Sequence, residues 1–169
     1  YETIRVNLAA GEQRTPEFLE INPQGLVPVL EDDGIVLTQS LPIHNYLEER
    51  YPEPALLPKD AAGRATSRAI GVAIACEIHP LNNLRVLQYL ERQLGLGEAQ
   101  RLVWYHHWMA EGLGPIEAML ARSAGAFCVG DTPGFADVCL VPQVYNARRY
   151  ECDLAPYPTI RRIDERCRQ

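Results

Sequence analysis

Two adjacent residues, Gln39 and Ser40, lie where a predicted strand runs into a predicted helix, and their side chains are suited to bind an anion. The free amides and the positive dipole end of a helix N-terminus favour a small carboxylate, which the Ser40 hydroxyl and the Gln39 amide would also hold. The alternative is an ordinary helix in which Ser40 is the N-cap and satisfies only its own backbone. Pro42 fits both interpretations, because a proline in the first helical turn loses no hydrogen bond.

Val27 and Pro28 offer a second type of contact. Pro28 lies at the start of a predicted strand, where a missing N–H is tolerated, and its peptide bond is a candidate for the cis form. The backbone N–H and C=O of Val27 would stay outside the strand ladder. They are then free to pair with an extended, peptide-like ligand, as in strand addition.

The elements that must position these residues are a hairpin and the helices around it. Two short runs rich in Val, Ile and Leu flank Asp33-Gly34, a dipeptide that tolerates positive φ and closes a tight hairpin. Thr15 as N-cap and Pro16 at the first helical position predict a short helix upstream. Residues 3–8 look like a strand, so the expected order is strand, helix, hairpin, helix.

The Val-Pro hairpin, Asp-Gly turn and Gln-Ser helix start together resemble the glutathione-binding half of the glutathione transferases. The segments Asn22-Pro23-Gln24-Gly25 and 46–52 also fit that family. Within it, residues 78–87 and 153–160 look like the zeta class, which contains the maleylacetoacetate and maleylpyruvate isomerases. The resemblance covers nearly the whole chain.

This resemblance implies an α/β plus all-α protein with the glutathione-transferase fold. Residues 1–54 are expected to form a thioredoxin-like glutathione-binding domain and residues 62–169 an all-helical substrate domain, joined by a proline-rich linker. Family members begin with a strand and helix that carry the group activating the glutathione sulfur. We therefore expect that segment to precede Tyr1, and the catalytic residue to lie within it.

The composition of the chain argues against several classes of protein. A net charge of −6 argues against a nucleic-acid partner that must neutralise phosphates. No apolar run approaches the ~20 residues needed to span a bilayer. Five cysteines without Cys-x-x-Cys spacing, and a His106-His107 pair without an i,i+4 partner, favour a reduced cytoplasmic protein with no metal site.

The resemblance also implies specific site residues. Glutathione, the expected cofactor, would be bound by Gln13, Gln24, Val27, Pro28, Gln39, Ser40, His79, Asn82 and Asn83. Arg85 and Arg149 would bind the substrate's carboxylates in the cleft between the domains, because a planar guanidinium grips a carboxylate bidentately and keeps its charge. Without the resemblance, both arginines would be solvated helix charges, Gln13 a surface residue and His79 a helix-terminal residue stabilised by the dipole.

Asp137 receives a structural rather than a catalytic assignment. It lies three residues after Gly134, where the acid of a capping box is expected at the start of a buried helix. Its carboxylate would satisfy backbone amides there. A role as catalytic acid is the alternative.

The implied activity is glutathione-dependent cis–trans isomerisation of maleylpyruvate or maleylacetoacetate to the fumaryl isomer in aromatic-compound catabolism. The thiolate adds to the cis double bond, the bond rotates, and elimination regenerates glutathione. Arg85 mildly favours maleylpyruvate, and the family resemblance implies a homodimer. Two alternatives are a transferase that conjugates small electrophiles or haloacids, and a noncatalytic docking module that keeps only the fold.

Overall fold

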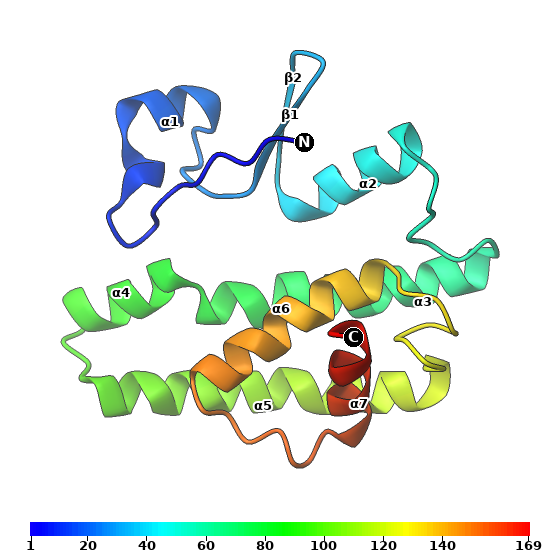
Figure 1. The fold of residues 1–169 in the computed structure, drawn as a ribbon. Coiled ribbons are helices and arrows are strands. Elements are labelled where there is room, and N and C mark those ends of the chain that lie inside the picture. The colour runs from blue at the N-terminus through cyan, green and yellow to red at the C-terminus, as the bar shows by residue number, and fades with distance from the viewer. The chain divides into compact units, whose positions relative to one another are not determined.

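The computed structural model describes all 169 residues, and its contacts divide the chain into two compact units, Tyr1–Glu53 and Pro54–Gln169. The first unit contains the strands and the second is entirely helical apart from an isolated bridge (Figure 1). No helix or strand forms between residues 52 and 60, the proline-rich stretch at which the units meet. This arrangement confirms the expected fold class, a thioredoxin-like α/β part followed by an all-helical part.

The hairpin of the first unit forms as the sequence predicts. Strands β1 (Val29–Asp32) and β2 (Ile35–Thr38) pair antiparallel, with Val29 opposite Thr38. The turn residues Asp33 and Gly34 have φ values of 48° and 78°, the left-handed conformation that their types tolerate. The unit also contains a 3-10 turn and two helices, which are Glu12–Arg14, α1 (Pro16–Ile21) and α2 (Ser40–Arg50).

The strand predicted at residues 3–8 does not form, because the segment has no regular secondary structure and pairs with neither β1 nor β2. A strand needs a partner for its backbone groups, and the sheet contains only β1 and β2. Ile4 accordingly stays 84% exposed. The prediction for α1 is confirmed, since the Thr15 hydroxyl accepts a hydrogen bond from the Phe18 amide at 3.3 Å.

Helix α2 is tied to the hairpin at its C-terminal end. The Asp32 carboxylate accepts hydrogen bonds from the hydroxyls of Tyr46 and Tyr51, each at 2.9 Å. Arg50 forms an exposed ion pair with Asp33 at 3.4 Å. These contacts join the last turns of α2 to the hairpin turn, so the orientation of its N-terminus follows from the hairpin.

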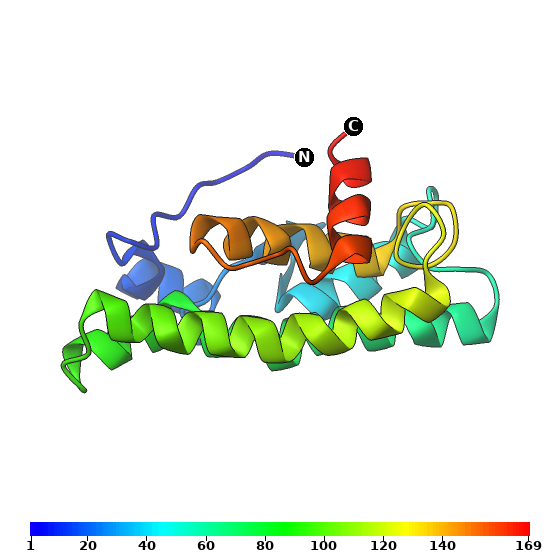
Figure 2. The same ribbon diagram turned by 90° about the horizontal axis from the view of Figure 1, so that it is seen from below.

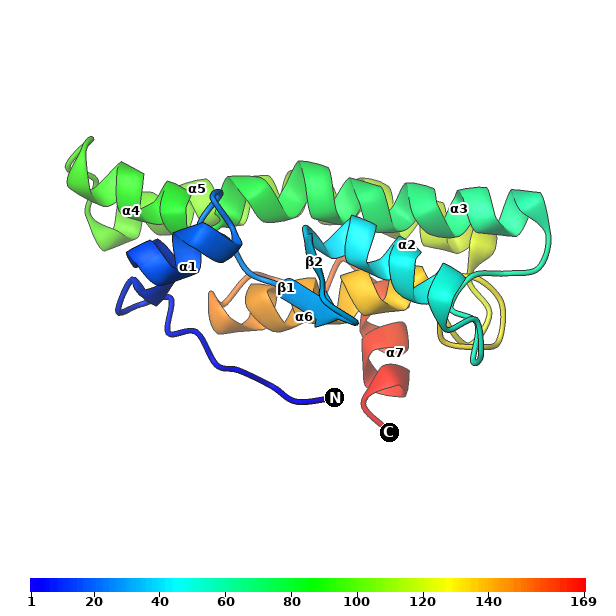
Figure 3. The same ribbon diagram turned by 90° about the horizontal axis from the view of Figure 1, so that it is seen from above.

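The second unit is a bundle built on the long helix α5. Its helices are α3 (Ala61–Val72), a π-helical turn Ala73–Ile78, a 3-10 turn His79–Asn82, α4 (Leu84–Arg92), α5 (Glu98–Ser123), α6 (Phe135–Arg149) and α7 (Pro158–Cys167). Figure 2 shows α7 standing across α5, and Figure 3 shows α3 and α4 following one another along the bundle. Pro80 lies in the 3-10 turn, just after the π-helical turn ends. No helix is both long and apolar enough to cross a bilayer.

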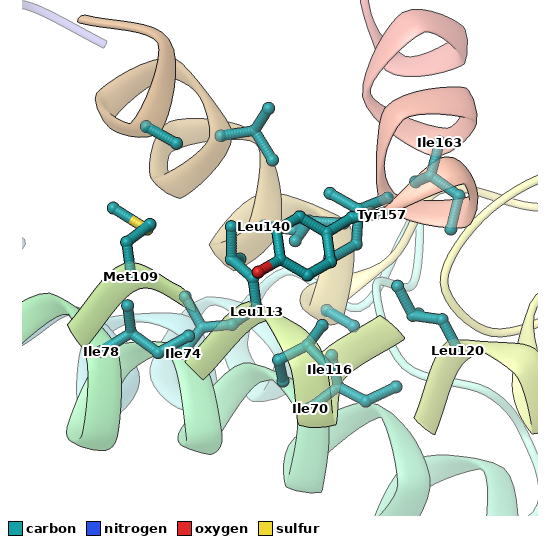
Figure 4. Close-up of a cluster of buried hydrophobic side chains, with 14 of the residues drawn as sticks. Ile70, Ile74, Ile78, Met109, Leu113, Ile116, Leu120, Leu140, Tyr157 and Ile163 are labelled. Atoms are coloured by element: carbon teal, nitrogen blue, oxygen red, sulfur yellow. The ribbon is translucent and has the colours of Figure 1, made fainter. Parts of the chain in front are cut away.

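The core of this unit lies between α5 and the helices packed on it. Figure 4 shows Ile70, Ile74 and Ile78 facing residues of α5. Gly112 permits this close approach, since a Cβ there would lie 2.3 Å from the Ile78 side chain. The buried residues of α5 are Tyr105, Met109, Leu113, Ile116 and Leu120. The apolar residues Trp104 and Trp108 of the same helix are only half-buried.

Helix α7 is held by charged groups from two other helices. The Glu117 carboxylate of α5 accepts hydrogen bonds from the amides of Thr159 and Ile160 at 2.8 and 2.9 Å, which caps the start of α7. Asp164 is fully buried and pairs with Arg148 of α6 and Arg168. The second unit is therefore fastened by both its apolar core and ion pairs between its helices.

Candidate functional site

The start of α2 differs from the prediction in one respect. Gln39, not Ser40, occupies the N-cap position, with φ 70° and ψ 128°, and no side chain caps the helix. The chain turns from β2 into α2 within this single residue, so Ser40 already belongs to the first helical turn. The exposed Ser40 hydroxyl makes no hydrogen bond within the protein, and the first amides of α2 remain open. The corner therefore keeps the donors that a carboxylate needs.

The loop before β1 is held by a residue to which the sequence analysis gave no role. Asn22 is 1% exposed, its amide donates to the Leu26 carbonyl at 2.7 Å, and its Oδ1 accepts from the Gln24 amide at 3.1 Å. The Asn22-Pro23-Gln24-Gly25 motif was the available signal, because Asn side chains commonly bond their own turn backbone. Asn22 therefore shapes the loop that leads to Val27.

Val27 presents its backbone as predicted from the neighbouring proline. The Val27–Pro28 peptide bond is cis, and Val27 is 40% exposed. Its N–H and C=O make no hydrogen bond in the structure, since the β1–β2 ladder begins at Val29. One donor and one acceptor are thus open to an extended peptide.

Three glutamines gather around this loop. The Gln39 amide donates to the Gln24 side chain at 2.7 Å, which joins the start of α2 to the loop. Gln13 lies on the other side of the loop. Its backbone carbonyl oxygen is so close to Gly25 that a Cβ atom at Gly25 would lie 2.9 Å from it. The Gln13 Oε1 is enclosed and has no hydrogen-bond partner. The first unit therefore brings together Gln13, Gln24, Val27, Pro28, Gln39 and Ser40.

These open groups fit a short peptide with a free carboxylate. The Val27 backbone can pair with a peptide unit, and the Ser40 hydroxyl with the first amides of α2 can bind a carboxylate. Glutathione offers both kinds of group. The residues present in this unit are consistent with the cofactor that the resemblance implies.

The other expected glutathione contacts lie in the helical unit, around the start of α4. Asn83 caps α4 by accepting from the Arg85 amide at 3.1 Å, and its side-chain nitrogen lies 3.4 Å from Nε2 of His79. Burial, and then the charge of Arg85, lower the pKa of His79. Asn82 is only 7% exposed, and its side-chain amide donates to the Tyr105 carbonyl at 3.3 Å, while its Oδ1 is enclosed without a hydrogen-bond partner.

A cavity of about 460 Å³ opens between α4, α5 and the end of α6. Its lining residues are Leu84, Leu87, Gln88, Glu91, Arg92, Glu98, Arg101, Leu102, Tyr105, Arg149, Tyr150 and Glu151. Arg149 therefore lies at a cavity, as a substrate-binding arginine should. Arg85 is exposed but does not line this cavity, so the structure does not bring the two arginines together there.

Aromatic rings form the wall beside Arg149. Tyr105 and Tyr150 stack with centroids 4.0 Å apart, and the Arg149 guanidinium lies 5.7 Å from the Tyr150 ring centroid. His106 Nε2 donates to the Tyr150 carbonyl at 2.6 Å and so fastens the end of α6 to α5. Burial raises the pKa of Tyr105, and the nearby charge of Arg149 opposes that rise.

Asp137 lies at the start of α6 and is 4% exposed. Its Oδ2 accepts from the Gly134 amide and its Oδ1 from the Cys128 amide, both at 2.9 Å. Both oxygens are therefore occupied by backbone donors, an arrangement that suits a residue of a capping box. No group of three or more His, Cys, Asp and Glu side chains is placed to hold a metal ion.

Comparison with known proteins gives the family. Residues 1–55 match the family model of the glutathione S-transferase N-terminal domain. The probable maleylacetoacetate isomerase of Vibrio cholerae is 46% identical over 170 residues, 99% of this chain and 79% of that protein.

Two solved structures agree. The holo structure of a bacterial zeta-class maleylpyruvate isomerase has a TM-score of 0.93 and 46% identity over 96% of this chain and 77% of that chain. A maleylacetoacetate isomerase of Methylobacterium extorquens AM1, with bound malonate and glutathione, has a TM-score of 0.91 and 39% identity over 99% of this chain and 79% of that chain. The chain belongs to the zeta-class glutathione transferases, the family that includes the maleylacetoacetate and maleylpyruvate isomerases.

Proposed function

We propose that this protein is a glutathione-dependent isomerase that converts maleylpyruvate or maleylacetoacetate to the fumaryl isomer. The observation that carries the proposal is the pair of open groups in the first unit, the unpaired Val27 backbone and the unbonded Ser40 hydroxyl. They are what a peptide cofactor with a carboxylate requires. The relatives named for this isomerase activity support the choice of reaction.

The residues of the first unit bind and orient the cofactor. Val27 pairs with its peptide backbone, Ser40 and Gln39 hold one carboxylate, and Gln13 holds the other end. Bound glutathione supplies a thiolate whose reversible addition to the double bond allows rotation from cis to trans. His79, Asn82 and Asn83 are the proposed contacts from the helical unit.

Arg149 and Arg85 bind the carboxylates of the substrate. An acid that carries one or two negative charges needs fixed cations to hold its reactive carbon in place. A guanidinium suits this role because it stays charged at every physiological pH. Arg149 is the better supported of the two, since it lies at the cavity.

We further infer a homodimer in the cytoplasm. All five cysteines are free thiols, which suits a reducing compartment. Family membership supports the dimer. Light scattering on the purified protein tests the dimer, and a mass of one chain would contradict it.

The activity is tested with the purified protein. The enone absorbance of maleylpyruvate is followed with and without glutathione, and free thiol is measured at the end. Decay only with glutathione, with no thiol consumed, is the expected result. Loss of thiol in step with substrate would identify a conjugating transferase, and no decay would contradict catalysis of this substrate. Repeating the assay with maleylacetoacetate ranks the two substrates by kcat/KM.

A further inference from the structure

Tyr105 is a polar residue of the cavity wall that the proposed function does not use. The residue is 1% exposed, and its hydroxyl has no hydrogen-bond partner among the side chains and backbone of the protein, although it is not enclosed there. Its ring is fixed by stacking on Tyr150, and the residue lines the cavity. A hydroxyl at a cavity wall without a partner in the protein can donate its hydrogen bond to a ligand that enters the cavity.

The charge beside this hydroxyl indicates the chemistry of that partner. Arg149 lines the same cavity and forms no ion pair within the protein, whereas Arg101 across the cavity is engaged with Glu91 at 2.7 Å. Burial raises the pKa of Tyr105, so its phenol stays protonated and can only donate toward an anion. A phenol donor next to an unpaired guanidinium is complementary to a carboxylate.

The remaining wall suits a short carbon chain. Leu84, Leu87 and Leu102 contribute apolar surface to the cavity. The cavity therefore offers one polar end and one apolar side, a combination typical of small-molecule sites. A free inorganic anion would leave the leucines without contact.

We propose that the Tyr105 hydroxyl donates a hydrogen bond to the substrate carboxylate that Arg149 binds, and that the leucine side of the cavity holds the adjoining carbon chain. This assignment rests on the proposed function and extends it, because it makes Tyr105 a binding residue for the acid end of the substrate. Tyr150 and His106 then act as positioning residues. The ring of Tyr150 supports Tyr105 and Arg149, and His106 anchors the Tyr150 backbone.

The variant Tyr105→Phe tests the assignment, because it removes the hydroxyl and keeps the stacked ring. We expect the substrate KM to rise about tenfold, the value for loss of one charge-assisted hydrogen bond. The Kd for glutathione and the melting temperature should not change. Tyr89→Phe is the matched control, since Tyr89 is 57% exposed on α4 and does not line the cavity.

A binding measurement separates this inference from the isomerase proposal. Malonate is titrated calorimetrically into glutathione-loaded protein, and Tyr105→Phe should weaken its binding by about the same factor as KM. Weaker malonate binding in a protein that turns over neither substrate would refute the proposed function and keep the subsite. Isomerase activity with unchanged KM and malonate Kd in the variant would overturn the subsite alone.

A second variant guards against a folding defect in Tyr105→Phe. Leu102→Trp places a larger apolar side chain in the cavity, one helical turn from Tyr105. We expect it to abolish malonate binding while glutathione binding persists. Unchanged malonate binding in Leu102→Trp would place the carboxylate elsewhere and contradict the proposal.

Discussion

Arg149 is exposed at the end of α6 and its guanidinium faces the Tyr150 ring, with no carboxylate of the protein in contact. We expect Arg149→Ala to raise the substrate KM about tenfold or more, because it removes a charged partner of the substrate. The affinity for glutathione should hardly change. Steady-state kinetics at saturating glutathione and a separate glutathione titration measure the two effects.

The control for this variant is Arg122→Ala, which removes an exposed arginine at the end of α5, away from the cavity. It should leave both constants unchanged. Equal losses of substrate and glutathione affinity in Arg149→Ala would show that the arginine supports the fold or the cofactor and does not select the substrate.

Asp137 has both carboxylate oxygens hydrogen-bonded to backbone amides at the start of α6. We expect Asp137→Ala to lower the free energy of unfolding by about 3 kcal/mol, because it leaves buried amides without acceptors. Denaturant titration measures this loss. The kcat per folded molecule should stay near that of the unmodified protein.

Asp131 supplies the comparison for Asp137, since its carboxylate accepts from only one exposed amide, that of Ala126 at 3.0 Å. Asp131→Ala should lower the free energy of unfolding by well under half as much as Asp137→Ala. If Asp137→Ala kept its stability but lost kcat, the catalytic-acid alternative would be correct.

The role of a single residue was predicted best where it depends only on the residue type and on its neighbours in the sequence. The hydrogen-bonding capacity of Val27 followed from the neighbouring proline. Ser40 was predicted as the N-cap of α2, but Gln39 occupies that position. The difference depends on the φ of 70° at Gln39, a conformation that glutamine rarely adopts. The burial of Asn82 against α5 depends on tertiary packing, which spacing along one helix does not reveal.

At the scale of elements, the loop before β1 depends on Asn22. Its side chain makes two hydrogen bonds inside the loop that ends at Val27. We expect Asn22→Ala to weaken glutathione binding about tenfold, because the Val27 backbone loses its fixed position. The substrate KM at saturating glutathione should not change. Calorimetric titration of glutathione tests the first effect and steady-state kinetics the second.

Asn45→Ala is the matched control for Asn22→Ala, since Asn45 is exposed on α2 and forms no side-chain hydrogen bond. Its glutathione affinity should equal that of the unmodified protein. An Asn22→Ala variant with normal glutathione affinity would mean that the loop keeps its shape without this side chain.

The elements that depend on local sequence signals formed as predicted. The elements that depend on a partner distant in sequence did not. The hairpin closes on two turn residues, and α1 begins at its own cap. Residues 3–8 have strand-like composition but no strand beside them. In α5 the spacing of apolar residues predicts burial of Leu113, Ile116 and Leu120, which are buried, whereas in the first half of the helix Tyr105 and Met109 are buried in place of Trp104 and Trp108, because packing against neighbouring helices selects the face.

At the scale of the whole chain, composition and proline placement indicated two parts, and contacts divide the chain at Glu53 and Pro54. The cavity at Arg149 was not foreseen in its shape, because its walls come from α4, α5 and α6, which are separated in sequence. The family resemblance predicted Arg149 as a substrate-binding residue but did not predict the aromatic residues beside it. Distant packing is the information that the sequence pattern lacked.

The thiols of the chain should differ sharply in reactivity. Burial raises the pKa of Cys139, Cys152 and Cys167 to about 11 and also raises that of Cys128, whereas Cys76 is exposed. The thiolate is the reacting form, so a rise of two units lowers its fraction about a hundredfold near neutral pH. We expect one thiol per chain to react rapidly with a disulfide reagent at pH 8. The other four should react at that pH only after unfolding.

The reactivity of the slow thiols should increase with pH. As the pH rises from 8 toward 11, the slow thiols should gain reactivity about tenfold per unit, because each unit below the pKa raises the thiolate fraction tenfold. Cys76→Ser should remove the rapid phase and leave the slow one. Two or more rapid thiols at pH 8 in the folded protein would contradict the burial of these cysteines. A single rapid thiol would mean that the protein's own cysteines compete little with glutathione for an electrophilic substrate.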